Sequence, residues 1–273
     1  MDDLTALKLQ IEWGADEALE EAPVNRLLVA PPPPNPLPQG EEGFLGHQKK
    51  TPPPLAGGGR GEGMTQPRSN PAQRATQAAG AAATIDQLRA AVASFDGCVL
   101  RDTASHLIIA QGDPAARLLL IGEPPTADDD RSGMAFAGPA GDYLDRMLAA
   151  ISLSRAQLLL TPLIPWRPPG DRPPSAAELA ICLPFLHRLI AIVAPRRLLI
   201  MGLLPARSLL PRTNARRRPR GEWVDVAVPD TSLVLPALPT FSALELMKAP
   251  EHRRAAWDDL RLLRRTLDED AAG

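Results

Sequence analysis

Short apolar runs alternate with longer amphipathic stretches in the second part of the chain. Three runs have the length of strands: "RLLLI" (117–121), "QLLLTPLI" (157–164) and "RRLLIMG" (196–202). Helical spacing is found in three stretches before and between them: "TIDQLRAAVASF" (84–95), "GPAGDYLDRMLAAI" (138–151) and "SAAELAICLPFLHRLIAIVA" (175–194). Strands that alternate with helices predict a mainly parallel sheet covered on both faces. We therefore expect an α/β fold, a three-layer α/β/α sandwich.

The residues before this region have a different texture. Residues 1–29 include a short amphipathic pattern typical of a helix, with Leu4, Leu7 and Trp13 among charges. Residues 30–83 are rich in Pro and Gly and then in Gln, Ala and Ser, a composition that cannot offset the entropy of ordering. The sequence therefore predicts an N-terminal helical segment over 1–29, a disordered linker over 30–83 and a folded domain over 84–273.

Charge and composition exclude several classes of protein. The net charge is -2 over 273 residues, so any nucleic-acid site must be a local basic patch. The two cysteines lack CxxC spacing and support neither a disulfide framework nor a complete zinc site. No apolar run approaches about 18 residues, and the acidic start lacks the features of a signal peptide. We expect a cytoplasmic monomer with no membrane partner. The sequence does not tell whether the chain has protein partners.

Two loops of unusual composition follow the first two apolar runs. They are "GEPPTADDDRSGMAFAGPAG" (122–141) and "TPLIPWRPPGDRPP" (161–174). Because the carboxyl ends of parallel strands meet at one edge of a sheet, these loops predict a ligand crevice. Together with "LIAIVAPRRLLIMG" and "AWDDLRLLRRTL", they resemble in order the motifs of the uracil-DNA glycosylase superfamily, in particular its iron-sulfur family four. The resemblance covers roughly residues 98 to 265.

The resemblance implies a role for the acidic residues of the first loop. Glu123 corresponds to the family's motif carboxylate, and Asp129 or Asp130 to the acidic pair that follows it. By resemblance, Glu123 and Asp129 are catalytic: they orient a water molecule or stabilise the cationic sugar that forms as the glycosidic bond breaks. Asp128 is better interpreted as part of a solvated turn.

An extruded base also needs a surface on which to lie. By resemblance, Phe136 stacks on the base, and a phenylalanine of the core is the alternative interpretation. Gly122, Gly138 and Gly141 have no side chain to block the approach of a base or a phosphate. We assign Gly122 to the base pocket, and Gly138 and Gly141 to DNA contact.

The chain departs from the family pattern within the base pocket. Pro162 falls where the family reads uracil with an asparagine, and a proline has neither a side-chain amide nor an N–H. Ser242 replaces the histidine of the HPxxLL loop, and loss of one such donor costs about 10²–10³ in rate. Thr126 replaces a glycine and fills space near the pocket floor. Leu246 and Met247 either form the apolar tip that the family wedges into DNA or pack on the last helix.

The cysteines match only part of the family's cluster site. A four-iron cluster needs four thiolates. Cys98 and Cys182 match two of the family's four positions, and Phe95 falls where the first partner would be. The sequence therefore predicts no intact 4Fe-4S cluster and no other cofactor.

Arginines provide the expected contacts to DNA. Arg167 and Arg172 border the second loop, and Arg216, Arg217 and Arg218 belong to the run "PRTNARRRPRG". Such clusters suit phosphates, although charge runs are also common in solvated loops.

Three functions remain open from the sequence. The first is hydrolysis of the N-glycosidic bond of uracil in DNA, for base excision repair, with activity weakened by the changed pocket residues. The second is the same reaction on another damaged base. The third is a catalytically inactive protein that binds DNA or a partner and retains the glycosylase fold.

Overall fold

A computed structural model describes residues 70–211 and 220–272. Six strands of these residues form one sheet in the order β1-β3-β2-β4-β6-β5. The four inner strands are parallel, and both edge strands run antiparallel to their neighbours. The strands are β1 (Gln111–Gly112), β2 (Leu118–Gly122), β3 (Leu159–Pro162), β4 (Arg197–Met201), β5 (Val224–Ala227) and β6 (Val234–Thr240). The expected mainly parallel sheet is therefore confirmed.

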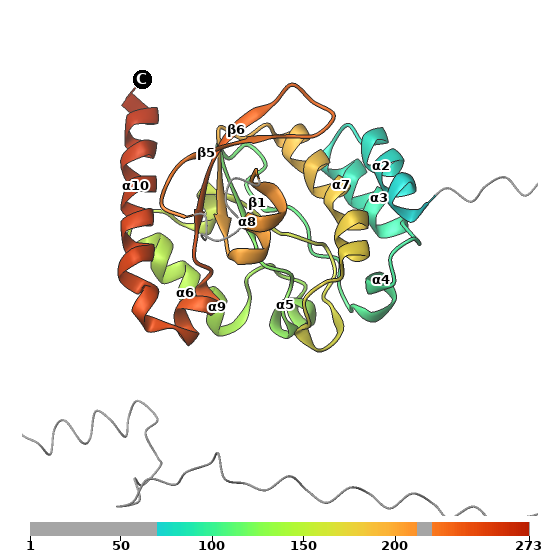
Figure 1. The fold of residues 1–273 in the computed structure, drawn as a ribbon, viewed down its shortest axis with the longest axis horizontal. Coiled ribbons are helices and arrows are strands. Elements are labelled where there is room, and N and C mark those ends of the chain that lie inside the picture. Colours follow the sequence, from blue (N-terminus) through green and yellow to red (C-terminus); the bar gives the residue numbers. More distant parts are fainter. Residues whose placement is uncertain (1–69, 212–219, 273) are drawn as a thin grey trace, which may run out of the picture. The chain divides into compact units, whose positions relative to one another are not determined.

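Helices lie on both sides of this sheet (Figure 1). Along β2, Leu119 and Ile121 face one hydrophobic cluster, while Leu118 and Leu120 face the other. The first cluster includes side chains of α2 (Pro71–Ala81), α3 (Ile85–Ser94), α7 (Ala176–Val193) and α8 (Leu203–Leu209). The second includes side chains of α6 (Gly138–Ala149), α9 (Ala243–Lys248) and α10 (Arg253–Ala272). This arrangement confirms the three-layer α/β/α sandwich.

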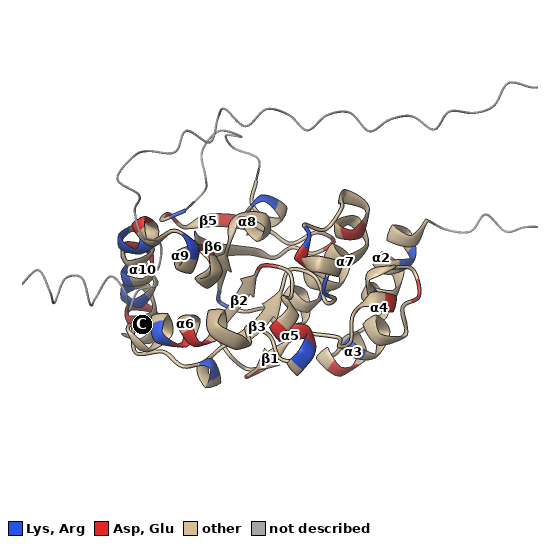
Figure 2. Ribbon diagram, turned by 90° about the horizontal axis from the view of Figure 1, so that it is seen from below, with Lys and Arg blue, Asp and Glu red and all other residues tan. Residues whose placement is uncertain are grey.

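Shorter elements connect these layers. Two are α-helical, α4 (Leu100–Thr103) and α5 (Ala127–Ser132), and three are 3₁₀ turns, η2 (Arg155–Gln157), η3 (Pro169–Asp171) and η4 (Pro250–His252). Helix α5 carries three of the acidic residues of the first loop, Asp128, Asp129 and Asp130 (Figure 2). It follows β2 directly and therefore lies at the carboxyl edge of the sheet.

The boundary predicted for the linker requires a correction. Helix α2 begins after Asn70, whose side chain accepts a hydrogen bond from the amide of Ala72 at 3.1 Å. Ala75 and Ala79 are buried in the first cluster, because their small side chains allow α2 to pack closely against α7. The last part of the predicted 30–83 linker therefore belongs to the fold. The predicted segments 1–29 and 30–69 lie outside the described residues.

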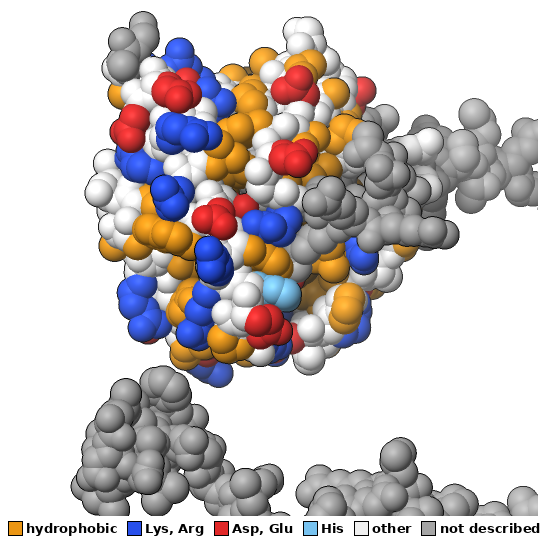
Figure 3. All heavy atoms as spheres, turned by 60° about the vertical axis from the view of Figure 1, so that its left-hand side comes forward, with side chains coloured by type: hydrophobic (Ala, Val, Ile, Leu, Met, Phe, Trp, Pro, Cys, Tyr) orange, Lys and Arg blue, Asp and Glu red, His pale blue; other side chains and the backbone are white. Residues whose placement is uncertain are grey.

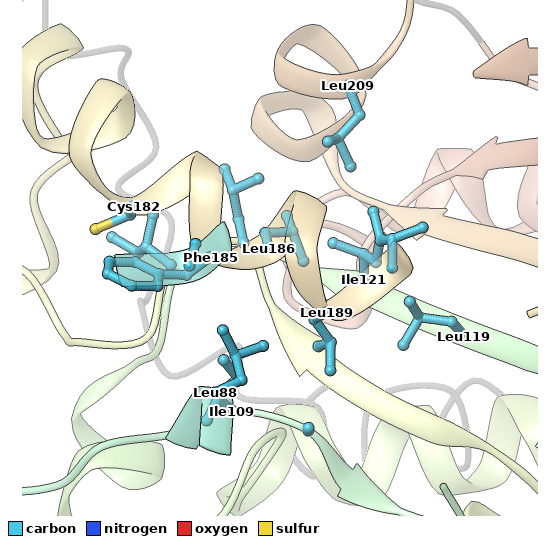
Figure 4. Packing of buried hydrophobic residues seen from close by; sticks show 14 of the residues in the cluster. Leu88, Ile109, Leu119, Ile121, Cys182, Phe185, Leu186, Leu189 and Leu209 are labelled. Carbon is cyan, nitrogen blue, oxygen red and sulfur yellow. The ribbon is translucent and has the colours of Figure 1, made fainter. Parts of the chain in front are cut away.

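Helix α7 is long and apolar enough, by length and composition alone, to cross a membrane, although no run of that length was expected from the sequence. In the structure, Cys182, Phe185, Leu186 and Leu189 point from α7 into the cluster that also contains side chains of β2 (Figure 4). Burying one such leucine or phenylalanine stabilises the fold by about 1.5–3 kcal/mol. One face of α7 is therefore packed in the protein core.

Candidate base-binding site

A hollow of about 570 Å³, which includes open solvent, lies at the carboxyl ends of β2, β3 and β4. The chain passes from β2 to β3 on one side and then to β4 on the other, so the hollow lies at the point where the strand order reverses. Open α/β sheets bind ligands at such points. Six residues that the sequence assigned to catalysis or to the base pocket line the hollow: Glu123, Thr126, Asp129, Phe136, Pro162 and Ser242.

Phe136 is held in the hollow by a loop of unusual backbone geometry. Its φ angle is +57°, a left-handed conformation that side chains rarely adopt. A Cβ on Gly122 would overlap the ring of Phe136, and a Cβ on Gly141 would overlap its carbonyl oxygen. Gly122 therefore makes room for the ring of Phe136, and its place in a base pocket stays a prediction. Gly141 is buried under the loop and supports it, which corrects its predicted contact with DNA.

Two side chains that the sequence analysis missed hold this loop. The guanidinium of Arg155 donates to the carbonyl oxygens of Ala135 at 3.0 Å and Phe136 at 2.7 Å. The Oε1 atom of Gln111 accepts from the amide of Ala135 at 2.7 Å. Neither residue stands in a motif, so only the fold could reveal these contacts.

The carboxylate of Asp129 is hydrogen-bonded within the loop. Its Oδ2 atom accepts from the amide of Thr126 at 2.7 Å and from the Thr126 hydroxyl at 2.9 Å. Its Oδ1 atom accepts from the amide of Ala137 at 2.6 Å. The carboxylate closes the capping box of α5 and ties it to the loop of Phe136. Both oxygens of Asp129 therefore hold the loop in position, and its catalytic role stays a prediction.

The aspartates on either side of Asp129 also have partners within the fold. The Oδ1 atom of buried Asp130 accepts from the amides of Ser105 at 2.8 Å and His106 at 3.0 Å. Asp128 forms an exposed ion pair with Arg131 at 2.9 Å, which agrees with its interpretation as part of a solvated turn. A Cβ on the neighbouring Gly138, whose φ is +65°, would overlap Asp128. Gly138 is exposed, and its contact with DNA stays a prediction.

Glu123 is the second carboxylate that lines the hollow. It follows β2, is half-buried, and its Oε1 atom lies 3.4 Å from the amide of Leu204 in the first turn of α8. A Cβ on Gly202, just after β4, would overlap the Glu123 carboxylate, so this glycine lets the acid lie between the two strand ends. Glu123 therefore lies at the carboxyl ends of β2 and β4 and lines the hollow.

A second hollow, of about 1060 Å³ including open solvent, adjoins the first. The two share Glu123, Pro124, Pro125, Thr126, Ser242 and Leu244 as lining residues. Arg207 and Lys248 border the second hollow and supply positive charge at its wall.

The segment that replaces the family's histidine loop is folded into the start of α9. The hydroxyl of Ser242 accepts from the amide of Glu245 at 3.2 Å, and the amide of Ser242 donates to Glu245 Oε2 at 2.8 Å. The prediction of a DNA-wedging tip must be corrected for Leu246, which is 1% exposed and lies in the second cluster. Leu244 and Met247, 38% and 39% exposed, are the apolar side chains at this surface.

The arginines predicted to contact DNA lie in different settings. Arg167 is paired with Asp171 at 2.7 Å. Arg172 donates two hydrogen bonds to Glu178, at 2.6 and 2.9 Å, and these hold the pKa of that buried carboxyl at about 2. The charge of Arg172 is therefore balanced within the fold.

The remaining predicted contacts, Arg216, Arg217 and Arg218, lie outside the described residues. Figure 3 looks onto the face that carries α10, where basic side chains lie among acidic and apolar ones. Exposed arginines of this helix include Arg253, Arg254, Arg261 and Arg265. Contact between any arginine of this chain and DNA stays a prediction.

The two thiols lie in the core beside each other. Cys98 and Cys182 are 2% and 0% exposed, and a hydrogen bond between them lowers the pKa of Cys98 to about 7 and, together with burial, raises that of Cys182. Phe95 packs edge to face on Phe185 in the same cluster. Two thiols beside an aromatic pair do not fit the four-iron cluster that the resemblance implies. Among the described residues, no group of three or more His, Cys, Asp or Glu side chains could hold a metal ion.

Comparisons with known proteins agree with this geometry. A type-4 uracil-DNA glycosylase of Pyrobaculum aerophilum is 29% identical over 138 residues, which cover 50% of this chain and 70% of that protein. The corresponding protein of Sulfurisphaera tokodaii is 31% identical over 120 residues, 44% of this chain and 54% of its own. That of Saccharolobus solfataricus is 26% identical over 188 residues, 67% and 86% of the two chains. Residues 109–261, more than half of the chain, match the profile of the uracil DNA glycosylase superfamily, and the protein therefore belongs to that superfamily.

Proposed function

We propose that the protein hydrolyses the N-glycosidic bond of a damaged base in DNA. One observation carries the proposal: the carboxylate of Glu123 and the ring of Phe136 line the same hollow at the carboxyl edge of the sheet. A ring on which a base can stack and an acid beside it are what removal of an extruded base requires. The similarity to type-4 uracil-DNA glycosylases supports DNA as the substrate.

In this proposal each residue has one task. Phe136 stacks on the base, and Glu123 orients the attacking water and stabilises the positive charge that develops on the sugar. Arg155 and Asp129 act through the loop that carries Phe136, because their hydrogen bonds end on its backbone. They are positioning residues.

Uracil is expected to be a poor substrate. Pro162 lines the hollow, with no amide that could read the edge of the base. A site that hydrogen-bonds its ligand discriminates by about 10⁴–10⁵, and that contribution is absent at this position. The Ser242 hydroxyl is an acceptor in the cap of α9 and is shorter than the histidine that it replaces.

The proposal is tested with single-stranded and duplex oligonucleotides that carry one uracil or hypoxanthine. The native chain, Glu123→Gln and the double variant Pro162→Asn with Ser242→His are compared under single-turnover conditions. We expect slow strand scission at abasic sites with the native chain, loss of scission in Glu123→Gln, and faster uracil release by the double variant. Since Ser242 caps α9, the double variant is first checked for folding, with an expected loss of about 1 kcal/mol.

The rival function is binding without catalysis. The observation that favours it is that Pro162 and Ser242 stand where the family pattern has an asparagine and a histidine. A binding protein would retain DNA affinity in Glu123→Gln and release no base from any substrate. Release of a base by the native chain that depends on Glu123 would exclude it.

A further inference from the structure

Two carboxylates line the hollow and several of its backbone donors are absent or engaged, and this points to its substrate class. Resting on the proposed hydrolysis of a glycosidic bond, we infer that the site takes an N-alkylated purine that carries a positive charge, in preference to uracil.

Several backbone donors at the hollow are absent or already engaged. Pro124, Pro125 and Pro162 line it and have no N–H. The amides of Thr126 and Ala137 both donate to Asp129. A base in this hollow finds none of these N–H groups free to meet its oxygens.

Three further donors near the hollow are also engaged: the Ala135 amide, the Thr126 hydroxyl and the Arg155 guanidinium. The amide of Ala135 donates to Gln111 at 2.7 Å. The Thr126 hydroxyl donates to Asp129 at 2.9 Å. The guanidinium of Arg155 also reaches the loop, but it is shared between Asp145 at 2.6 Å and the carbonyl oxygens of Ala135 and Phe136.

The charged side chains that line the hollow are both carboxylates, those of Glu123 and Asp129. Apart from the hydroxyls of Thr126 and Ser242, the other side chains of the lining are apolar and include Ile108, Leu144 and Met201. Carboxylates stabilise a cation and destabilise a developing anion, while apolar side chains accommodate an alkyl group.

Leaving-group chemistry makes this difference decisive. When the bond from C1′ to uracil breaks, the electron pair leaves with the base, which becomes an anion and needs donors to stabilise it. When the bond from C1′ to an N-alkylated purine breaks, the same electron pair neutralises the positive charge of the base. Water adds to C1′ and gives its proton to Glu123, so that the products are an abasic sugar and a neutral alkylpurine.

The space also fits a two-ring base. The hollow continues into the second, larger one along Glu123, Thr126 and Ser242, which line both. A purine stacked on Phe136 therefore has room to extend past these residues.

The test uses the full chain, prepared from a host strain that lacks its own alkylpurine glycosylases. DNA treated with dimethyl sulfate and DNA containing uracil are incubated with native protein, Glu123→Gln, or Glu222→Gln, a matched change of an exposed glutamate. Released bases are measured by chromatography, with the rate in the absence of protein subtracted.

We expect the native chain and Glu222→Gln to release methylpurines at least about tenfold faster than uracil, and Glu123→Gln to lose about 10²–10³ of that rate. Uracil released at an equal or greater rate would overturn the inference and leave the proposed function intact. Failure to release either kind of base would overturn both. Equal methylpurine release by Glu123→Gln would overturn the assigned chemistry.

Discussion

Replacement of Asp129 by alanine separates a positioning role from a catalytic one. The change removes the acceptor of two backbone amides, those of Thr126 and Ala137, and of the Thr126 hydroxyl. A buried donor left without a partner costs about 1–3 kcal/mol, and water can reach the half-buried Thr126 and Ala137 in part. We therefore expect the free energy of unfolding to fall by roughly 3 kcal/mol.

The measurement is urea denaturation followed by fluorescence, with base release by the folded protein measured in parallel. Asp128→Ala is the matched control, because Asp128 lies in the same helix but forms only an exposed ion pair with Arg131, worth at most about 1 kcal/mol. We expect Asp129→Ala to lose more stability than Glu123→Gln and less activity per folded molecule. An Asp129→Ala protein of native stability with no base release would refute the positioning role and restore the catalytic one.

Further predictions concern packing, pH and salt. Gly141→Ala is expected to lower stability and base release together, since its Cβ would overlap the carbonyl of Phe136; Gly80→Ala, with nothing within 4 Å of its Cβ, should raise stability by about 0.5–1 kcal/mol in thermal denaturation. Arg172 lowers the pKa of Glu178 to about 2 from an ordinary value of 4.5, so this ion pair stabilises the native state above about pH 4.5 and is lost as pH falls toward 2; Glu178→Gln should flatten that part of a stability–pH curve, and an unchanged curve would contradict the assignment. DNA affinity should fall steeply with added salt if phosphates are contacted, and a constant affinity in a fluorescence-anisotropy titration would exclude such contacts.

Three of the four inner strands could be predicted because they are buried on both faces. The three apolar runs became β2, β3 and β4, as their continuous leucines and isoleucines predicted. Helix α2 could not be predicted in the same way, because its alanine-rich sequence carries little hydrophobic signal and is ordered by packing against α7. In β6, Pro236 and Pro239 interrupt the pattern expected of an inner strand.

The residues of the site were predictable only as far as motifs extend. Glu123 and Phe136 belong to one loop after β2, and Pro162 was placed beside them because its loop follows a neighbouring parallel strand. The engagement of Asp129 and the contacts of Arg155 depend on side-chain hydrogen bonds across the loop, and sequence spacing does not determine them. The burial of Leu246 follows from the direction of α9, which a six-residue helix in isolation does not reveal.

The central claim is that Glu123 acts on a base stacked against Phe136. The most direct test counts abasic sites formed under single-turnover conditions in DNA that carries both uracil and methylpurines, with native protein and with Glu123→Gln at equal folded concentration. The account predicts abasic sites with the native chain and a rate lower by about 10²-fold with Glu123→Gln. Equal numbers of abasic sites with both proteins, or none with either, would contradict it.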